Sequence, residues 1–343
     1  MNDMKKGWDN IVTINEAVEF LCETNEALPQ NNFLLLTHSH PDADTLGSAT
    51  ALALALRQLG KNAAVLTGFV PSRYAFLNKD GVFVASSPYK KHLTVSADIA
   101  SPRLLGEHGE AFDNKIDLAI DHHIENTLSA KRKLVLTERA ACGEIIYDLI
   151  TAMNVAITPD IAEALYAAIS SDTGGFKYSA VSAHTHNIAA ELLKTGIDFA
   201  EINRILFETK SKEQFLLEKI AYSSLEIFAD GFIALISFDS KALSDFGIDA
   251  IQTDYGGIAQ LPRQLEGVEV GIMLRPEIGD KSYKISMRSN RYINVAEICA
   301  LFGGGGHYHA AGCSIVGELD EVKSVVVREV EKRFEKTRTF DNQ

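Results

Sequence analysis

Residues 33–48 of this chain read FLLLTHSHPDADTLGS, an apolar run followed directly by two histidines and two aspartates. The run from Phe33 to Leu36 predicts a buried strand and residues 49–59 predict a helix, so the polar residues are expected on the loop between them. Gly47 and Ser48 would open the helix at the positive end of its dipole. We therefore expect this loop to bind a metal or a phosphate.

Three further segments carry acidic or imidazole side chains at the end of an apolar run. The sequence Asp121-His122-His123 follows a predicted strand at 116–120, and Asp98 follows one at 93–97. Asp172 ends a predicted helix that includes residues 161–171. Ligands of parallel α/β sheets gather at the carboxyl ends of strands. Any one of these aspartates would also suit a cap, but the joint pattern predicts a metal site.

The order of these four motifs resembles that of the DHH phosphoesterase superfamily. Further along, the sequence Gly303-Gly-Gly-Gly306-His307, followed by Ala310-Ala-Gly312, resembles the glycine-rich signature of the DHH-associated domain. The resemblance extends from near Phe33 to near Gly317. Within the superfamily, the short two-domain arrangement is similar to bacterial oligoribonucleases (nanoRNases) that also act as phosphatases on 3'-phosphoadenosine 5'-phosphate (pAp).

The resemblance implies two divalent metal ions and a ligand set for each. One ion would be held by His38, Asp42 and Asp98, and the other by Asp44, Asp98, His122 and Asp172, with Asp98 as the bridge. Carboxylate oxygens combined with imidazole suit manganese or magnesium better than a metal that prefers thiolates. We expect manganese, with magnesium as the alternative.

Further residues of the first domain acquire roles from the same resemblance. His123 would face the phosphate without holding metal, and Asp121 would orient a histidine from behind the ligands. His40 is interpreted as a loop residue beside the site, which leaves contact with substrate open. His123 and Asp121 are thus the candidate catalytic residues of this domain.

The second domain is expected to bind the substrate. Backbone amides could approach a ligand closely at the four residues without a Cβ, which are Gly303, Gly304, Gly305 and Gly306. His307 would reach toward the scissile phosphate as a third candidate catalytic residue. Arg288 and Ser289 would bind a substrate phosphate, a task that suits the planar fork of arginine.

The composition limits the class of protein and its partners. A chain of 343 residues with 46% hydrophobic and 23% charged residues is long enough for two cores. The formal net charge of −13 argues against binding long duplex nucleic acid, since such affinity comes from many contacts between phosphates and Lys or Arg. The four cysteines lack zinc-ligand spacing and are expected to be buried. With no signal peptide or membrane-spanning stretch in the sequence, we expect a cytoplasmic protein without a membrane partner.

Alternating strand and helix patterns up to about Gly196 predict an α/β domain with a doubly wound parallel sheet. Its expected strands are 33–37, 63–67, 93–97, 116–120 and 133–136, preceded by a helix at 14–24. The rest predicts a smaller α+β domain with strands 232–238, 268–274, 283–287 and 313–316 and helices 249–265, 295–302 and 320–336. We thus expect domains at 1–197 and 230–343, joined by a helical connector at 198–229.

The combined prediction is a two-metal phosphoesterase that cleaves short RNA oligonucleotides to mononucleotides and pAp to AMP. Alternatives within the class are a linear or cyclic dinucleotide phosphodiesterase, an inorganic pyrophosphatase and a RecJ-type exonuclease. The last is disfavoured because the acidic chain has no room for added nucleic-acid-binding modules. A catalytically silent nucleotide-binding regulator is the alternative from another class. A homodimer is left open.

Overall fold

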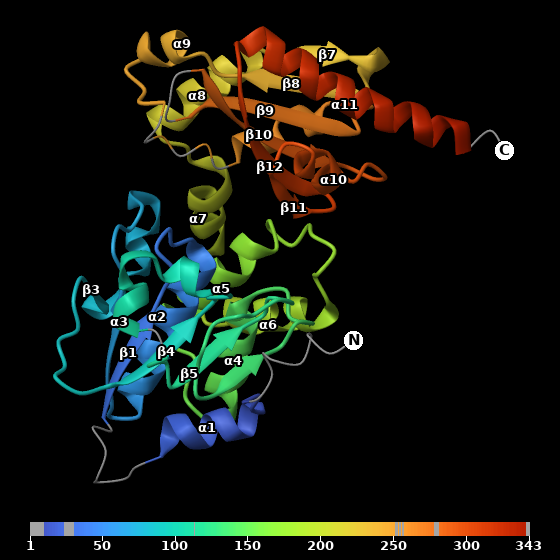
Figure 1. The fold of residues 1–343 in the computed structure, drawn as a ribbon. Helices are drawn as coiled ribbons and strands as arrows, with labels where there is room; N and C mark the ends of the chain where they lie inside the picture. The colour runs from blue at the N-terminus through green and yellow to red at the C-terminus, as the bar shows by residue number, and fades with distance from the viewer. Residues whose placement is uncertain are drawn as a thin grey trace. The chain divides into compact units, whose positions relative to one another are not determined.

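The computed structural model describes residues 10–23, 31–112, 114–250, 253, 255, 257–277 and 281–340. The chain divides into two compact units, residues 1–209 and 210–343 (Figure 1). Each unit has its own six-stranded sheet and its own hydrophobic core. The division falls inside the stretch that the sequence predicted as a connector.

The sheet of the N-terminal unit is parallel throughout, with the strand order β3-β2-β1-β4-β5-β6. The strands are β1 (Asn32–Leu36), β2 (Asn62–Leu66), β3 (Phe83–Val84), β4 (Leu93–Ala97), β5 (Leu118–Asp121) and β6 (Lys133–Val135). Strand β1 is buried on both faces, since Phe33 and Leu35 contribute to one core cluster and Leu34 and Leu36 to another. A strand that is buried on both faces has a continuous run of apolar residues in its sequence.

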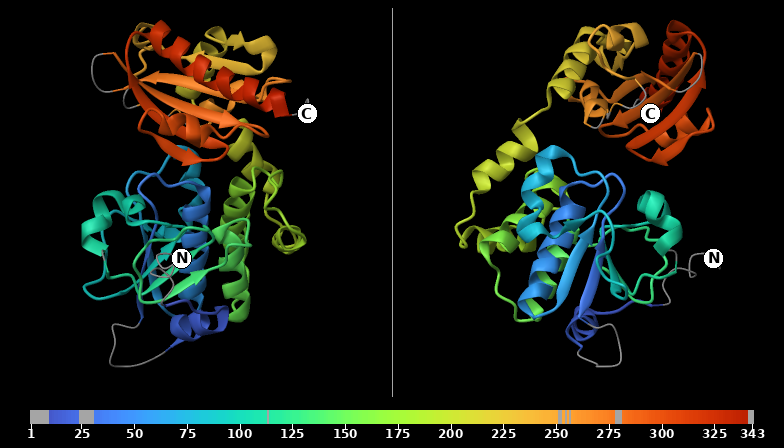
Figure 2. Two further views of the ribbon diagram at one scale, coloured as in Figure 1. Left: turned by 45° about the vertical axis from the view of Figure 1, so that its right-hand side comes forward. Right: turned by 90° about the vertical axis from the view of Figure 1, so that its left-hand side faces the viewer.

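Most helices of the N-terminal unit cover one face of the sheet. They are α1 (Ile14–Cys22), α2 (Ala43–Gln58), α4 (Cys142–Ala152), α5 (Pro159–Asp172), α6 (Ala183–Leu193) and α7 (Phe199–Asn203), with the 3-10 helices η1 (Ser72–Leu77) and η2 (Lys79–Gly81) nearby and the π-helix η4 (Arg204–Glu208) after α7. Helices α2 and α5 pack so closely that a Cβ at Gly47 would overlap the carbonyl oxygen of Ala164. The 3-10 helix η3 (Pro102–His108) and α3 (Gly109–Phe112) lie on the opposite face (Figure 2).

The sheet of the C-terminal unit is mixed, with the order β11-β12-β10-β9-β8-β7 and β8 parallel to β9. Its strands are β7 (Glu226–Phe228), β8 (Ile233–Ser237), β9 (Val270–Pro276), β10 (Ser282–Ser289), β11 (Gly305–His307) and β12 (Ala310–Val316). Helices α10 (Val295–Ala300) and α11 (Leu319–Phe340) pack on one face, while α8 (Lys212–Ser223) and α9 (Ser240–Ser244) pack on the other. Three 3-10 helices complete the unit: η5 (Ala229–Gly231), η6 (Ile258–Gln260) and η7 (Pro262–Gln264).

The predicted fold class is confirmed, and four local predictions are wrong. Helix α2 begins at Ala43, six residues before the predicted start, because Asp42 caps it. The end of the predicted helical connector forms strand β7, which pairs with β8. In place of a helix at 249–265, the described residues form η6 and η7, since Pro262 lacks an N–H for a longer helix. The predicted glycine loop instead enters strand β11.

Two smaller predictions are also resolved. Cys142, Cys299 and Cys313 are buried as expected, whereas Cys22 is partly exposed at the end of α1. Among the described residues, no helix is long and apolar enough to cross a membrane. Residue 24 of the predicted first helix, residues 251, 252, 254 and 256, and the first nine residues of the chain lie outside the described residues.

Candidate metal centre

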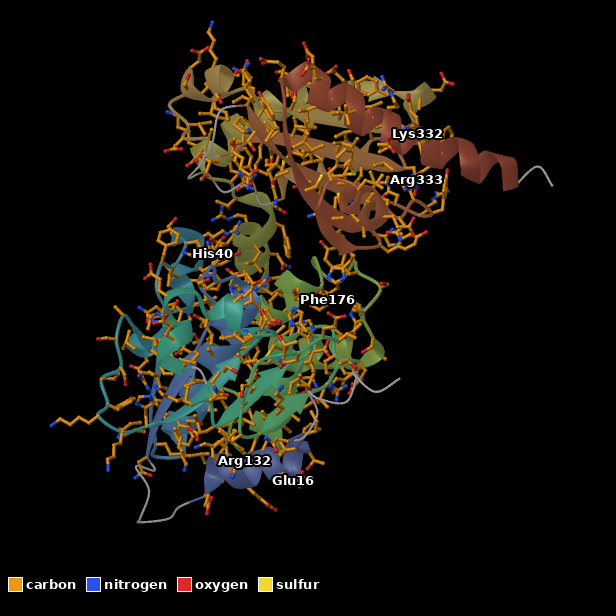
Figure 3. The ribbon with its side chains drawn as sticks, in the orientation of Figure 1. Glu16, His40, Arg132, Phe176, Lys332 and Arg333 are labelled. Atoms are coloured by element: carbon orange, nitrogen blue, oxygen red, sulfur yellow. The ribbon has the colours of Figure 1, made fainter. Side chains whose placement is uncertain are left out.

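The candidate ligands of the N-terminal unit come together at the carboxyl ends of β1, β4 and β5. The structure gathers all seven predicted side chains there: His38, Asp42, Asp44, Asp98, His122, His123 and Asp172. In Figure 3, the label of His40, which follows β1, marks this end of the unit, and the label of Arg132, which precedes β6, marks the opposite end. His40 is exposed, and its Nδ1 lies 3.2 Å from the hydroxyl of its neighbour Ser39, in keeping with a loop position.

Asp42 combines two roles at the start of helix α2. Its Oδ1 accepts hydrogen bonds from the backbone N–H of Asp44 and Thr45, at 3.0 and 3.1 Å. The same oxygen lies 3.6 Å from His38 Nε2. Burial raises the pKa of Asp42, but His38 and the backbone donors outweigh burial and leave the pKa below its ordinary value. Asp42 therefore remains a carboxylate beside His38.

Asp44 lies inside the first turn of α2, not on the predicted loop, and its side chain is fully buried. Its Oδ2 accepts from the N–H of Cys142 at 2.7 Å, and its Oδ1 accepts from Gly143 at 2.9 Å. Ser48, expected at the helix start, lies one turn further along α2 and donates to Asp44 Oδ1 at 3.1 Å. The first N–H groups of α4 thus point at this carboxylate, where the helix dipole favours negative charge.

Asp98 lies at the centre of the cluster in a strained backbone conformation. Its φ of 61° is in the left-handed region, which is uncommon for a residue with a side chain. Its Oδ1 is buried and has no hydrogen-bond partner among the described residues. This oxygen lies 3.5 Å from His122 Nε2, while Oδ2 lies 4.0 Å from His38 Nε2. The carboxylate therefore faces both groups of predicted ligands, as a bridge requires.

His122 is surrounded by carboxylates on its Nε2 side. Besides Asp98, Nε2 lies 3.4 Å from Asp172 Oδ2 and 3.9 Å from Asp44 Oδ2. On the other side of the ring, Nδ1 lies 3.2 Å from the backbone oxygen of Arg139. When Nδ1 donates a hydrogen bond to that carbonyl, the lone pair of Nε2 is free to bind a metal. This arrangement is typical of a ligating histidine.

His123 is held differently from His122. Its Nδ1 lies 2.7 Å from Oδ1 of the buried Asp121, which also accepts from the N–H groups of both histidines. Asn126 fixes the other oxygen of Asp121 by donating from Nδ2 at 2.6 Å. The histidine that Asp121 orients is therefore His123, whose side chain is 46% exposed. The hydrogen bond that His123 donates to the Asp121 carboxylate is the main reason that the pKa of His123 is raised.

The electrostatics of the cluster favour a bound cation. Burial and the charge of Asp98 hold the pKa of Asp44 well above its ordinary range, and burial raises that of Asp172 to about 6. Burial disfavours the charged form of His122, but the carboxylates of Asp98, Asp44 and Asp172 outweigh it and raise its pKa to about 10. Protons thus take the place of the positive charge that these crowded carboxylates need. Oxygen and imidazole donors around a bare carboxylate oxygen fit divalent metal ions.

Three groups of donor atoms in this region are compact enough to hold a metal ion, each with its atoms within 4.8 Å of one another. They are His38, Asp42 and Asp98; Asp44, His122 and Asp172; and Asp98, Asp121, His122 and His123. The first group is the predicted ligand set of one ion, and the second contains three of the four ligands predicted for the other ion, without Asp98. The third also contains His123, so the geometry leaves this histidine within reach of a metal.

In the C-terminal unit, Arg288 lines a pocket on one face of the sheet. The pocket has a volume of about 290 Å³ and includes Arg275, Ser286, Tyr255 and Gln260. Burial and the charge of Arg263 lower the pKa of Arg288. Among the described residues, neither Arg275 nor Arg288 forms an ion pair with a carboxylate. These arginines are therefore available to an anionic ligand.

The other predicted substrate residues differ in accessibility. Ser289 is only 1% exposed, and its hydroxyl lies 2.9 Å from Nδ1 of His309, so it does not share the pocket with Arg288. Gly304 and Gly306 allow close packing, since a Cβ at either position would overlap the backbone of β12. All four glycines and His307 are nevertheless exposed. The glycine segment is thus a hairpin edge whose exposed amides and imidazole can meet a ligand.

Comparison with known proteins identifies the family. The model of the DHH family, N-terminal domain, matches residues 32–169, and that of the DHHA1 domain matches residues 239–336. The bifunctional oligoribonuclease and PAP phosphatase NrnA of Thermus thermophilus is 30% identical over 93% of this chain and 95% of that protein. The chain belongs to the DHH family. The family contains metal-dependent phosphoesterases.

Two further comparisons concern a second curated protein and a solved structure. The Mycoplasma genitalium protein of the same name is 26% identical over 95% of this chain and 99% of that protein. A crystal structure of an exopolyphosphatase-related protein from Bacteroides fragilis shares the fold, with a TM-score of 0.79 and 23% identity over 93% of this chain and 95% of that one.

Several residues that complete the DHH centre were missed from the sequence. Asn126 fixes Asp121, and the backbone of Arg139 contacts His122. The amides of Cys142 and Gly143 hold Asp44. Most of these contacts use backbone atoms, which leave no side-chain signal. Asn126 lies five residues after Asp121, but nothing in the local pattern distinguishes it from an ordinary loop asparagine.

The Asp121–His123 pair generates a pH-dependent prediction for the metal-free protein. We expect Asp121→Asn to lower the pKa of His123 toward its ordinary value of about 6.5, because the anionic acceptor is lost. A raised native pKa stabilises the fold at low pH, and this contribution disappears as the pH rises through that pKa. The variant should therefore lose more stability at pH 5 than at pH 9.

NMR titration of the histidine rings and urea unfolding at both pH values test this expectation. Asn126→Ala is the matched control, since it keeps the carboxylate and should leave the pKa of His123 raised. An unchanged pKa in Asp121→Asn would show that another group sets it.

Proposed function

We propose that this protein is a two-metal phosphoesterase that hydrolyses short RNA oligonucleotides to mononucleotides and pAp to AMP. The observation that carries the proposal is the carboxylate of Asp98, whose buried, bare Oδ1 faces His122 while its Oδ2 faces His38. A shared carboxylate between two sets of donors is what a pair of cations needs. The names of the Thermus and Mycoplasma relatives support the choice of substrates.

In this proposal, one ion is held by His38, Asp42 and Asp98, and the other by Asp44, Asp98, His122 and Asp172. A pair of divalent ions at these residues would supply polarisation of phosphoryl oxygens and a lowered pKa for a bound water. Manganese is the ion proposed, because carboxylates and imidazoles suit it and no thiolate is among the donors. Backbone N–H groups at 2.7 to 3.1 Å hold the carboxyl groups of Asp42 and Asp44 in position for this task.

His123 is the proposed catalytic residue that acts on the phosphate directly. Its Nδ1 is engaged by Asp121, so Nε2 remains for a phosphoryl oxygen. The raised pKa of His123 favours the imidazolium, which can donate a hydrogen bond to charge that grows on the phosphate. Asp121 acts through His123 by orienting its ring.

The C-terminal unit is proposed to select the substrate. Arg288 would bind a phosphate, and His307 with the exposed part of the Gly303–Gly306 segment would meet the phosphorylated end of the ligand. Ser289 supports this site less directly, by its contact with His309. Short substrates are favoured because a chain with a net charge of −13 offers little positive surface for more nucleotides. We expect the protein to act in the cytoplasm, where RNA fragments arise.

The bridging role of Asp98 generates the main test of the function. Asp98→Asn should lower turnover by at least about 10³-fold, the scale for loss of a preorganised electrostatic element, while a thermal melt shows an intact fold. A panel of pAp, short RNAs, linear and cyclic dinucleotides and pyrophosphate, each with saturating manganese, identifies the substrate. Near-normal turnover in the variant would contradict the two-metal centre, and exclusive cleavage of pyrophosphate or cyclic dinucleotides would contradict the substrate assignment.

The two histidines of the DHH motif should separate metal binding from chemistry. His122→Ala should lose bound manganese, because its Nε2 lies among three carboxylates. His123→Ala should keep most manganese and lose kcat, since the imidazole acts on the phosphate. Elemental analysis beside steady-state kinetics distinguishes the variants. Equal loss of metal in both would refute the division and make His123 a ligand.

The pocket at Arg288 generates a prediction about substrate length. Arg288→Ala should weaken binding of phosphorylated substrates by roughly 1.5–3 kcal/mol, the range for hydrogen bonds to charged groups, and barely affect bis-p-nitrophenyl phosphate. In the wild type, kcat/KM should fall from a dinucleotide to a pentanucleotide to a 24-mer. A 24-mer that is the best substrate, or equal damage to all esters in the variant, would favour a processive nuclease instead.

A further inference from the structure

A chain of polar contacts outside the ligand set joins α4, α6 and the turn before α4. Arg139 Nη2 lies 2.9 Å from Asp148 Oδ2, and Asp148 Oδ1 lies 3.1 Å from His184 Nε2. The side chains of Arg139 and Asp148 are only 22% and 15% exposed. An ion pair in this environment is screened less than one on the open surface.

The same arginine contacts the metal centre through its backbone. The carbonyl oxygen of Arg139 lies 3.2 Å from Nδ1 of His122, and its N–H donates to the oxygen of Leu136 at 3.1 Å. The side chain of Arg139 is therefore anchored to Asp148 on helix α4. This contact fixes the short turn before α4, whose carbonyl oxygen contacts the candidate metal ligand His122. The orientation of a ligating imidazole is set by the bond that its other nitrogen makes.

We propose that Arg139, Asp148 and His184 form a positioning clamp for His122. The clamp holds the Arg139 carbonyl in place, and that carbonyl holds the His122 ring so that Nε2 faces Asp98, Asp172 and Asp44. Arg139 and Asp148 are positioning residues, since neither side chain touches the ligand set. The inference rests on the metal centre of the proposed function, but not on the identity of the substrate.

Two observations argue that the clamp does more than join helices. A separate tie already connects α4 and α6, because Thr185 Oγ1 donates to Glu144 at 2.6 Å and both residues are buried. In addition, Arg139 Nε is buried and has no hydrogen-bond partner among the described residues. A buried unsatisfied donor costs stability. An arginine kept at such a cost is better explained by the turn that it fixes than by helix packing.

The test measures manganese affinity in the full-length protein without substrate. Free Mn²⁺, followed by electron paramagnetic resonance during titration, gives the affinity of wild type, Arg139→Met and Arg139→Lys. We expect about 10-fold weaker binding for Arg139→Met, the lower end of the range for groups that support metal ligands. Arg139→Lys should recover part of the loss, because it can still pair with Asp148.

A control uses another Arg–Asp pair of this unit that has the same separation and a more exposed aspartate. Arg57 Nη1 lies 2.9 Å from Asp80 Oδ2, and Arg57 is near the end of α2, roughly 20 Å along the helix from Asp42. Asp80→Asn should leave manganese affinity unchanged, whereas Asp148→Asn should lower it. Thermal melts of the metal-free proteins report stability separately. If Arg139→Met does not fold, the comparison of Asp148→Asn with Asp80→Asn tests the same point.

The outcomes separate the clamp from the proposed function. Wild-type affinity in folded Arg139→Met or Asp148→Asn, even with a lower melting temperature, would overturn the clamp and leave a purely structural tie. A graded loss of manganese affinity in the variants supports the clamp. If wild type loaded with manganese leaves RNA and pAp intact, only the proposed substrates are refuted, and the clamp still stands. Wild type that binds no manganese would overturn both.

Discussion

The crowding of carboxylates around Asp98 is the constraint on which the rest of the N-terminal unit depends. Asp44, Asp98 and Asp172 all approach Nε2 of one histidine within 3.9 Å, and the side chains of Asp44 and Asp98 are buried while that of Asp172 is partly exposed. Like charges in such a setting repel strongly. The fold sustains this arrangement through its core, which also holds the left-handed backbone of Asp98. Strain of this kind persists only where the surrounding structure determines it completely.

Helix α4 provides much of the structure that holds these carboxylates in place. Its N-cap residue, Ala141, has no side chain that could accept from the first N–H groups of the helix. The carboxylate of Asp44 accepts from Cys142 and Gly143 instead, across 98 residues of sequence. One side chain therefore satisfies a helix end and is a candidate metal ligand. Because the turn before α4 also contacts His122, a shift of this one helix would disturb both ligands together.

The sequence predicted the parts of the structure that continuous side-chain patterns encode. The strands from β1 to β6 that carry apolar runs are within two residues of their predicted bounds, because strands buried on both faces have no polar interruption. The gathering of the ligand candidates followed from their positions after those runs. Helix α2 was misplaced because its first turn contains Asp44 and small residues, a pattern without apolar periodicity. Strands β7 and β11 pair with segments that follow them closely in the sequence, but each is only three residues long, too short for a strand pattern to show.

The positions of individual arginines in the C-terminal unit matter more for ligand binding than the net charge of the chain suggests. The chain carries an excess of 13 acidic groups, yet Arg275 and Arg288 share a pocket and Arg263 is near enough to lower the pKa of Arg288. Bringing like charges together costs free energy, which an anionic ligand between them would recover. The repulsion due to net charge acts over long distances and is screened by salt. An arginine guanidinium, by contrast, forms paired hydrogen bonds with a phosphate at contact distance. In the proposed function, this distribution of charge disfavours a long polyanion and favours a single phosphorylated end beside Arg275 and Arg288, so the proposed preference for short ligands follows from where these two arginines lie.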